Sequence, residues 1–361
     1  MKKLFYLAFI ALSLPVFTSC DNDDEPEQKY NAPFSMYFLN EGSWGKNNAS
    51  ITGIEKNDFD ILETSDIYMT YNGQNLGDVA QDLIYDEKTH NLYVSVSESK
   101  YIAKLSATGK ELARYSSTET QAQPRSLVLE DGKLYASFYG GMVARFDTVA
   151  LTLEATVNVG TYSEEMAVID GKMAVCNSGY GAENTISIID LKTFTVSNTI
   201  ELPHYNPQDI VACNGKFYCN TTEYDEFWNA DNTIVEINPS NWNTKDIAKA
   251  FYMAPSDNKL YLAKSETDWS TYSTVNTFSV YDTATGKTSD TFLNEENRTF
   301  LKDKSIYGIS VDPSNGDVYI PVTNTEGYEA LNSDVYVFGA VGSTPIKYTA
   351  GVYCSKVVFA E

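Results

Sequence analysis

The sequence predicts an all-β protein, a seven-bladed β-propeller with four antiparallel strands in each blade. Two kinds of signal predict this fold. A turn-and-strand pattern returns at intervals of roughly 40–50 residues, the length of one propeller blade. No segment shows a long helical period, which argues against folds that alternate helices and strands. We therefore expect residues 34–361 to form one ring; a β-sandwich followed by a second β domain is the alternative.

The repeated unit is a short turn followed by a strand with a tyrosine at a fixed place. Asn-Gly and Asp-Gly turns between alternating apolar residues are strong hairpin signals, because Asn, Asp and Gly tolerate positive φ. A third strand follows in most units and a fourth completes each. The equivalent places in the second strands are Tyr93, Tyr135, Ala174, Tyr218, Tyr261 and Tyr319. The expected third strands are Tyr101–Leu105, Val143–Phe146, Thr185–Ile189, Thr233–Ile237, Thr277–Tyr281 and Val335–Phe338.

The two ends of the repeat region complement each other. Phe34–Leu39 matches a second strand, since Tyr37 occupies the repeated tyrosine place, but no first strand precedes it. Val352–Phe359 resembles a first strand with nothing after it. We expect the C-terminal strand to join the N-terminal blade, which closes the ring and removes two exposed sheet edges.

The N-terminus reads as a targeting segment. Lys2 and Lys3 precede an apolar run, Leu4–Leu14, that is too short to span a bilayer, and small residues then precede Cys20. This arrangement resembles a bacterial lipobox, so residues 1–19 are expected to be a lipoprotein signal peptide and Cys20 the lipidated residue. An ordinary secretory signal is the alternative.

An acidic stretch follows the cysteine. Residues 20–33 are expected to form the lipidated end and a flexible tether, because Asp21–Glu27 is acidic and lacks apolar periodicity. An acidic run at this place resembles the surface-export signal of lipoproteins in gut Gram-negative bacteria. A merely solvated spacer is the alternative.

Composition excludes several functions. There are 26 Lys and Arg against 49 Asp and Glu, a net charge of −23, so phosphate backbones would be repelled and nucleic-acid binding is not expected. Only two histidines are present, which leaves little room for His-based catalysis or a His-rich metal site. His90 and His204 are expected on opposite faces, and neither belongs to a catalytic triad pattern. We expect no enzyme, no catalytic cofactor and no metal site; a calcium ion in the central channel is the alternative.

The cysteines after Cys20 are expected to be free. Cys213 and Cys219 flank a hairpin turn whose register pairs Cys213 with Lys216 and Cys219 with Ile210. The two sulfurs would then lie roughly 10 Å apart, too far to bridge. We expect Cys213, Cys219, Cys176 and Cys354 to act as small buried apolar residues.

One face of the predicted ring carries long aromatic loops. Tyr and Trp supply rigid contact area with a hydrogen-bonding tip, and the Asn and Gln among them match amides and hydroxyls. Long loops are usually functional, so we expect this face to bind a large polar-edged ligand. Aromatic residues that merely cover blade ends are the alternative. The candidate ligand-binding residues are Trp44, Tyr68, Gln123, Arg125, Tyr180, Tyr205, Tyr224, Phe227, Trp228, Trp269, Tyr272 and Tyr328.

The lipobox, the acidic tether and the seven divergent blades together resemble the YncE-like, BtuG-type family of surface lipoproteins of gut bacteria. The resemblance covers the whole chain, but the blade motifs specify no ligand. It implies an outer-membrane, lipid-anchored cell-surface protein that binds cobalamin and other corrinoids. It also implies a partner, a BtuB-type TonB-dependent transporter to which the ligand passes. The alternatives are a lipoprotein for a glycan or haem-like ring, a channel-metal hydrolase, and a partner-binding lid without a small ligand.

Overall fold

A computed structural model describes residues 33–56, 61–118, 122–268, 273–289, 292–339 and 345–360. The chain separates into Met1–Asn31, which lies outside the described residues, and a second, compact unit, Ala32–Glu361. The expected signal peptide, Cys20 and most of the acidic tether lie outside the described residues. Within the described part, no helix is both long and apolar enough to cross a membrane.

The second unit consists of seven four-stranded antiparallel sheets, one for each blade. Blade 1 contains β28 (Cys354–Phe359), β1 (Met36–Asn40), β2 (Ser50–Lys56) and β3 (Ile61–Thr64). Blade 2 contains β4 (Ala80–Asp86), β5 (Asn91–Val96), β6 (Tyr101–Ser106) and β7 (Glu111–Ser116). Blade 3 contains β8 (Pro124–Glu130), β9 (Lys133–Phe138), β10 (Met142–Asp147) and β11 (Leu153–Asn158). Blade 4 contains β12 (Ser163–Ile169), β13 (Lys172–Asn177), β14 (Thr185–Asp190) and β15 (Thr195–Glu201).

The remaining three blades follow the same plan. Blade 5 contains β16 (Pro207–Cys213), β17 (Lys216–Tyr224), β18 (Ala230–Ile237) and β19 (Thr244–Ala248). Blade 6 contains β20 (Tyr252–Ser256), β21 (Lys259–Asp268), β22 (Ser273–Asp282) and β23 (Lys287–Ser289). Blade 7 contains β24 (Ser310–Val311), β25 (Val318–Glu326), β26 (Glu329–Phe338) and β27 (Ile346–Val352). Short helices α1 (Ile67–Asn72), η1 (Gly179–Gly181) and α2 (Glu295–Leu301) lie in connections.

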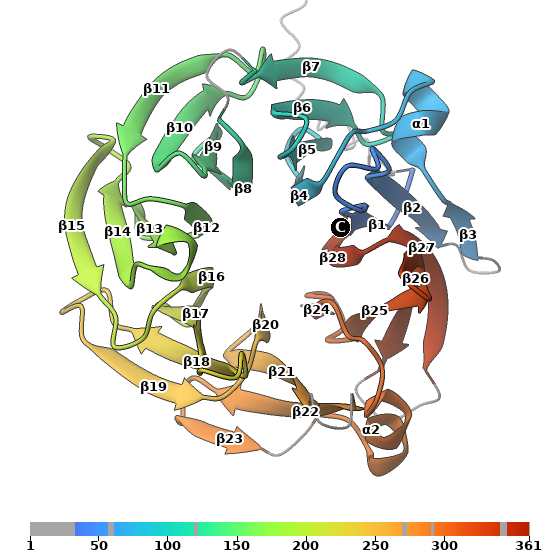
Figure 1. The fold of residues 1–361 in the computed structure, drawn as a ribbon. Coiled ribbons are helices and arrows are strands. Elements are labelled where there is room, and N and C mark those ends of the chain that lie inside the picture. Colours follow the sequence, from blue (N-terminus) through green and yellow to red (C-terminus); the bar gives the residue numbers. More distant parts are fainter. Residues whose placement is uncertain are drawn as a thin grey trace, which may run out of the picture. The chain divides into compact units, whose positions relative to one another are not determined.

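The first strands of the blades lie innermost and surround the axis of the ring, a region here called the channel (Figure 1). Each contacts the first strand of the next blade, in the closed cycle β28, β4, β8, β12, β16, β20, β24 and back to β28. The predicted seven-bladed fold with four strands per blade is therefore confirmed.

Ring closure by the C-terminal strand is also confirmed. β28 pairs antiparallel with β1, so that Met36 lies opposite Phe359 and Leu39 opposite Lys356. The strand begins at Cys354, two residues later than expected. Val352 is the last residue of β27, and Tyr353 has a positive φ of 53° that separates the two strands.

The repeated tyrosine joins several blades to the next one. Tyr37 donates a hydrogen bond from its hydroxyl to the Ala107 carbonyl of blade 2 at 2.8 Å, and Tyr93 does the same to Thr148 of blade 3 at 3.2 Å. In blade 7 the Tyr319 ring packs edge-on against Phe359 of blade 1, with centroids 5.1 Å apart. These bulky side chains fill the seams between sheets, which explains why the sequence repeats them.

The cysteine register is as predicted. Cys213 pairs with Lys216 and Cys219 with Ile210, so these two cysteines do not meet. Cys176, Cys213, Cys219 and Cys354 are all buried free thiols.

A buried charge in the closing strand should weaken the whole ring. Val357 of β28 is 4 % exposed and packs with Phe38 and Ile54 of blade 1. Val357→Asp should lower the free energy of unfolding by about 3 kcal/mol or more, because an unpaired carboxylate would be buried. Urea unfolding followed by circular dichroism measures this change.

The matched control is Val149→Asp, since Val149 is 80 % exposed in the turn between β10 and β11. This change should cost less than about 0.5 kcal/mol. Equal midpoints for the two variants would contradict a closing role for β28.

Candidate functional site at the loop face

The candidate site lies on one face of the ring, here called the loop face. It is formed by the loops between second and third strands and by the connections between blades. The opposite face carries mostly short turns such as Asp131-Gly132 and Asp170-Gly171, in which the aspartates take positive φ. This division follows from strand order, because all second strands run toward the same face.

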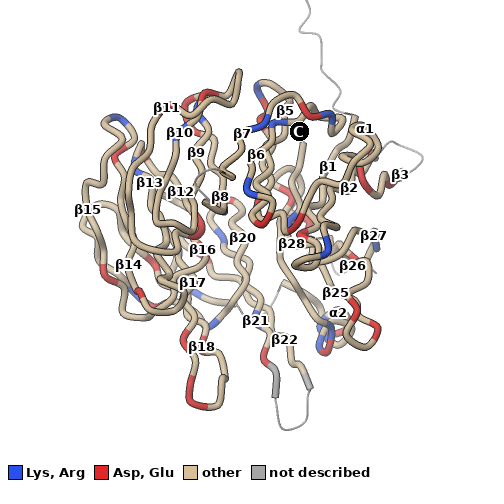
Figure 2. Tube along the Cα trace, turned by 45° about the horizontal axis from the view of Figure 1, so that its top comes forward, with Lys and Arg blue, Asp and Glu red and all other residues tan. Residues whose placement is uncertain are grey.

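The loop face is higher on one side. In blades 5, 6 and 7 the second and third strands have 8 to 10 residues, whereas in blades 2, 3 and 4 they have 6. The hairpins β17–β18 and β21–β22 project beyond the rest of the ring (Figure 2). A ligand on this face would therefore contact long hairpins on the side of blades 5 to 7 and short loops on the side of blades 2 to 4.

Large aromatic side chains are exposed at the loop tips. Tyr180 is 84 % exposed, Trp44 77 % and Trp228 76 %, and Tyr328 is fully exposed at the tip of β25–β26. Tyr180 and Trp228 also have positive φ values of 56° and 64°. Strained backbone and exposed aromatic rings are both unfavourable for an isolated protein and are typical of binding surfaces.

Some of the candidate residues lie together. The Tyr224 and Trp228 rings are 6.1 Å apart at the tip of β17–β18, which also carries the exposed Phe227. A second group leads from the channel to the rim and includes two tyrosines that were not predicted from the sequence. Arg125 lies 5.7 Å from the Tyr139 ring, Tyr139 lies 5.7 Å from Tyr162, and Tyr162 lies 5.3 Å from Tyr180.

The other candidates are dispersed. Gln123 donates to Glu98 at 2.9 Å, and Tyr205 is half exposed in the connection before β16. Tyr68 is different, because it is fully buried on α1 and its hydroxyl bonds to the Glu111 carboxylate. Its side chain forms part of the core rather than of the exposed face. Trp269 and Tyr272 lie outside the described residues.

The channel beneath this face contains charges placed by β-bulges. A register shift occurs near the start of each of the strands β28, β4, β8, β12 and β16. Bulges redirect side chains and are frequent beside functional sites. The charged residues at or beside these shifts are Lys356, Asp82, Arg125, Glu164, Glu165 and Asp209.

Close ion pairs join neighbouring blades in the channel. Lys356 Nζ lies 2.6 Å from Asp82 Oδ1, and the other Asp82 oxygen accepts from the Leu127 backbone N–H at 2.7 Å. Arg125 Nε lies 2.7 Å from Glu164 Oε2. These charge-assisted bonds fix the first strands of blades 1 to 4 relative to one another.

Carboxylates outnumber cations in the channel, and their pKa values reflect it. Burial and the nearby carboxylates of Asp82 and Asp209 raise the pKa of Glu165 to about 8. Burial also raises the pKa of Asp209 to about 6, although Lys356 opposes the shift. At neutral pH Glu165 is therefore largely protonated, and the two channel cations, Arg125 and Lys356, are already paired with carboxylates.

At the loop-face end of the channel, a tyrosine hydroxyl bonds to a carboxylate. Tyr307 donates to Glu41 Oε2 at 3.0 Å and packs 5.3 Å from the Tyr353 ring. Burial raises the pKa of Glu41, while Arg125 and the Tyr307 hydroxyl act against it. The channel mouth thus combines aromatic rings with hydrogen-bonding groups, as the loops of the loop face do.

Nearly all of these channel residues are missing from the set predicted from the sequence. A signal was available, because aligned first strands place Asp82, Glu165, Asp209 and Lys356 directly before an apolar residue at the same place of the repeat. The predicted set came only from the loops after second strands and the connections between blades, and Arg125 entered it as a loop residue. Arg125 instead belongs to β8 and faces the channel.

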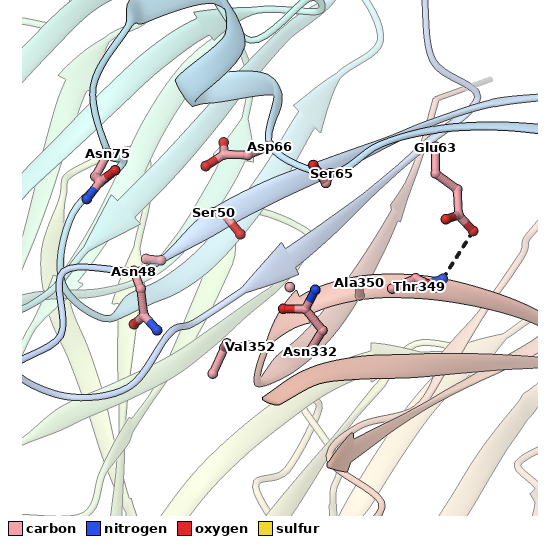
Figure 3. Close-up of a pocket in the computed structure, with 12 residues that line it drawn as sticks. Asn48, Ser50, Glu63, Ser65, Asp66, Asn75, Asn332, Thr349, Ala350 and Val352 are labelled. Atoms are coloured by element: carbon pink, nitrogen blue, oxygen red, sulfur yellow. Dashed lines mark hydrogen bonds between the residues drawn. The ribbon is translucent and has the colours of Figure 1, made fainter. Parts of the chain in front are cut away.

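A polar cavity opens at the seam between blades 7 and 1 on the same face (Figure 3). Its volume is about 390 Å³. The lining is rich in amides, hydroxyls and carboxylates and contains no aromatic ring. Its polar side chains include Asn48, Asn75, Asn332, Ser50, Ser65, Asp66 and Glu63.

Within the described residues, no three His, Cys, Asp or Glu side chains are arranged to hold a metal ion. The face and channel are instead built from rings, amides and paired charges. A propeller of this kind suggests a binding or scaffold role.

The chain belongs to the DUF5074 family, described as a domain of unknown function, whose model matches residues 35–359. No curated protein matches the sequence. Among solved structures, hydrazine synthase of Kuenenia stuttgartiensis is similar, with a TM-score of 0.57 and 15 % identity over 72 % of this chain and 76 % of that one. The Pan2 WD40 domain of Neurospora crassa has a TM-score of 0.49 and 10 % identity over 74 % and 90 %. At 15 % identity, the first likeness shows the fold alone.

Glu165 should make stability depend on pH. Its pKa of about 8 in the folded chain exceeds the ordinary value of about 4.3, so the folded state retains a proton that the unfolded chain releases. Its contribution therefore falls as pH rises from about 4 to 8. Glu165→Gln should raise the free energy of unfolding at pH 8 by roughly 1–3 kcal/mol and leave it nearly unchanged at pH 4. Urea unfolding across this range measures the difference.

The control is Glu87→Gln, an exposed carboxylate in the turn between β4 and β5. It should change the unfolding free energy by less than about 0.5 kcal/mol at either pH. A Glu165→Gln curve parallel to that of the natural protein would contradict the raised pKa.

Proposed function

We propose that this protein is a non-enzymatic binding protein that holds a corrinoid such as cobalamin on its loop face. The observation that carries the proposal is the set of exposed, strained aromatic residues at loop tips of one face, above a channel mouth lined by tyrosines. A corrinoid has a broad ring with many peripheral amides. Tyr and Trp rings match its faces, while Asn, Gln and Tyr hydroxyl groups match its amides.

Charge supports the same ligand class. The two channel cations, Arg125 and Lys356, are already paired with the carboxylates of Glu164 and Asp82. An anionic ligand such as a nucleotide or a polyphosphate would have to break one of these ion pairs, at a cost in free energy, to gain a cation among the described channel residues. A ligand whose edge consists mainly of neutral amides avoids this cost.

The cellular part of the proposal rests on the sequence. A lipobox at Cys20 and the acidic run after it support an outer-membrane lipoprotein displayed at the cell surface. In that place the protein would capture corrinoid and pass it to a BtuB-type TonB-dependent transporter. Palmitate labelling that is lost in Cys20→Ser, together with protease accessibility on intact cells, tests this part separately from ligand binding.

Binding itself has a direct test. The purified protein mixed with cyanocobalamin should remain pink after desalting and give a calorimetric signal. Trp228→Ala or Trp269→Ala should weaken binding by about 0.5–1.5 kcal/mol, roughly 2- to 12-fold, because an aromatic contact is lost. A colourless protein without a heat signal would overturn the proposal.

Trp242→Ala serves as the matched tryptophan control, because Trp242 lies in the turn between β18 and β19 on the opposite face. A folded Trp242→Ala protein should bind cyanocobalamin with unchanged affinity. Equal loss in all three variants would show that the effect is general destabilisation rather than loss of a loop-face contact.

The polar cavity between blades 7 and 1 favours a second candidate, a glycan-binding protein. Amides and carboxylates such as Asn48, Asn332 and Asp66 bind sugar hydroxyls readily. Glycan-array binding that is lost in Asn332→Ala, with no cyanocobalamin signal, would favour this candidate over the first.

A further inference from the structure

Two cysteines from neighbouring blades meet at a seam of the ring. Cys176 lies in β13 of blade 4 and Cys219 in β17 of blade 5. Their sulfur atoms are 3.7 Å apart, and both side chains are fully buried. The surroundings are apolar, with Ile186 and Val235 in the same core cluster.

The separation is small enough for a bond. A disulfide joins two sulfurs at about 2.05 Å, so closure needs less than ~2 Å of movement, which side-chain rotation can provide. The other two cysteines of the ring contact different groups. Cys213 Sγ lies 3.4 Å from the Asp257 carbonyl oxygen, and Cys354 belongs to the core between blades 7 and 1.

We propose that Cys176 and Cys219 form a disulfide that joins blades 4 and 5 when the chain folds in an oxidising compartment. A thiolate of one cysteine attacks an oxidant of the disulfide class, such as glutathione disulfide, and releases one glutathione thiolate. The second cysteine thiolate then attacks the mixed disulfide and releases the other. Two protein thiols are thereby oxidised, one disulfide is reduced to two thiols, and the protein's two protons pass to solvent or to the departing thiolates.

Burial dictates when the bond can form. In the folded ring neither thiol is exposed, and burial raises the pKa of Cys176 well above its ordinary value. The reactive thiolate is therefore scarce and beyond the reach of an external disulfide. Oxidation belongs to the folding stage, before the seam closes, and the folded pair resists later exchange.

The bond would close a long loop. Cys176 and Cys219 are 43 residues apart in sequence, so the link encloses β14, β15 and β16. Restricting so long a loop in the unfolded chain stabilises the folded state. For a ring of this size the expected gain in melting temperature is on the order of 5 °C.

The test uses the full-length chain with Cys20→Ser, which leaves the four cysteines of the ring. The protein is refolded with reduced and oxidised glutathione, alkylated under denaturing conditions and digested without reduction. Mass spectrometry should find a peptide pair that joins Cys176 to Cys219, two alkylated thiols at Cys213 and Cys354, and a melting temperature about 5 °C above that of the reduced protein. Four alkylated thiols after oxidative refolding, or linkage through Cys213 or Cys354, would overturn the proposal.

Variants provide a second readout. Cys176→Ser and Cys219→Ala should abolish the difference in melting temperature between oxidative and reductive refolding, whereas Cys213→Ser should retain it. A difference that survives in Cys176→Ser would contradict the assignment. The proposal does not depend on the ligand, so a colourless protein in the cyanocobalamin experiment would leave it standing.

Discussion

The pairing of β28 with β1 is the constraint on which the remaining structure depends. These two strands lie at opposite ends of the folded chain, and their register places Leu39 opposite Lys356. Without this pairing blade 1 would lack its first strand, and the cycle of first-strand contacts around the channel would open. The same strand carries Lys356, whose ammonium group bonds to Asp82 of blade 2. Closure of the ring therefore also forms the ion pair between Lys356 and Asp82.

Much of the fold was predictable because local and global signals agree. Turns such as Asp131-Gly132 and Asn214-Gly215 form hairpins, and the repeated tyrosines fill the seams between sheets. Both features therefore recur in the sequence at the spacing of one blade. The start of β28 was placed two residues early, because Val352 continues the apolar pattern of the strand. Tyr353 has a positive φ that separates β27 from β28, but a tyrosine does not indicate this backbone conformation in the sequence as Asn, Asp or Gly does.

The candidate site was less predictable. Loop composition identifies exposed rings such as Trp228 and Tyr180, since these residues stand in long polar loops that have few apolar neighbours to cover them. It does not distinguish Tyr68, which lies in a similar sequence context but is buried and bonds through its hydroxyl to Glu111. The channel charges depend on bulges, which shift the alternation of a strand by one residue, so they can be found by aligning the first strands of the blades but not from the alternation within one strand. The contact between Cys176 and Cys219 depends on how the sheets of blades 4 and 5 pack against each other. The strand register within one hairpin does not predict that packing.

The unequal hairpins of blades 5 to 7 have a consequence for orientation. A ring of seven identical blades would offer a disc-shaped ligand seven equivalent poses, so no single edge of the ligand would be selected. The longer hairpins β17–β18, β21–β22 and β25–β26 belong to three adjacent blades, which form one continuous arc and remove that degeneracy (Figure 1). The first two of these hairpins project beyond the rest of the ring (Figure 2). A ligand with distinct edges would then enter over the low arc and stop against the high one in a single pose. The departure from sevenfold symmetry thus makes one orientation of a bound ligand different from the other six.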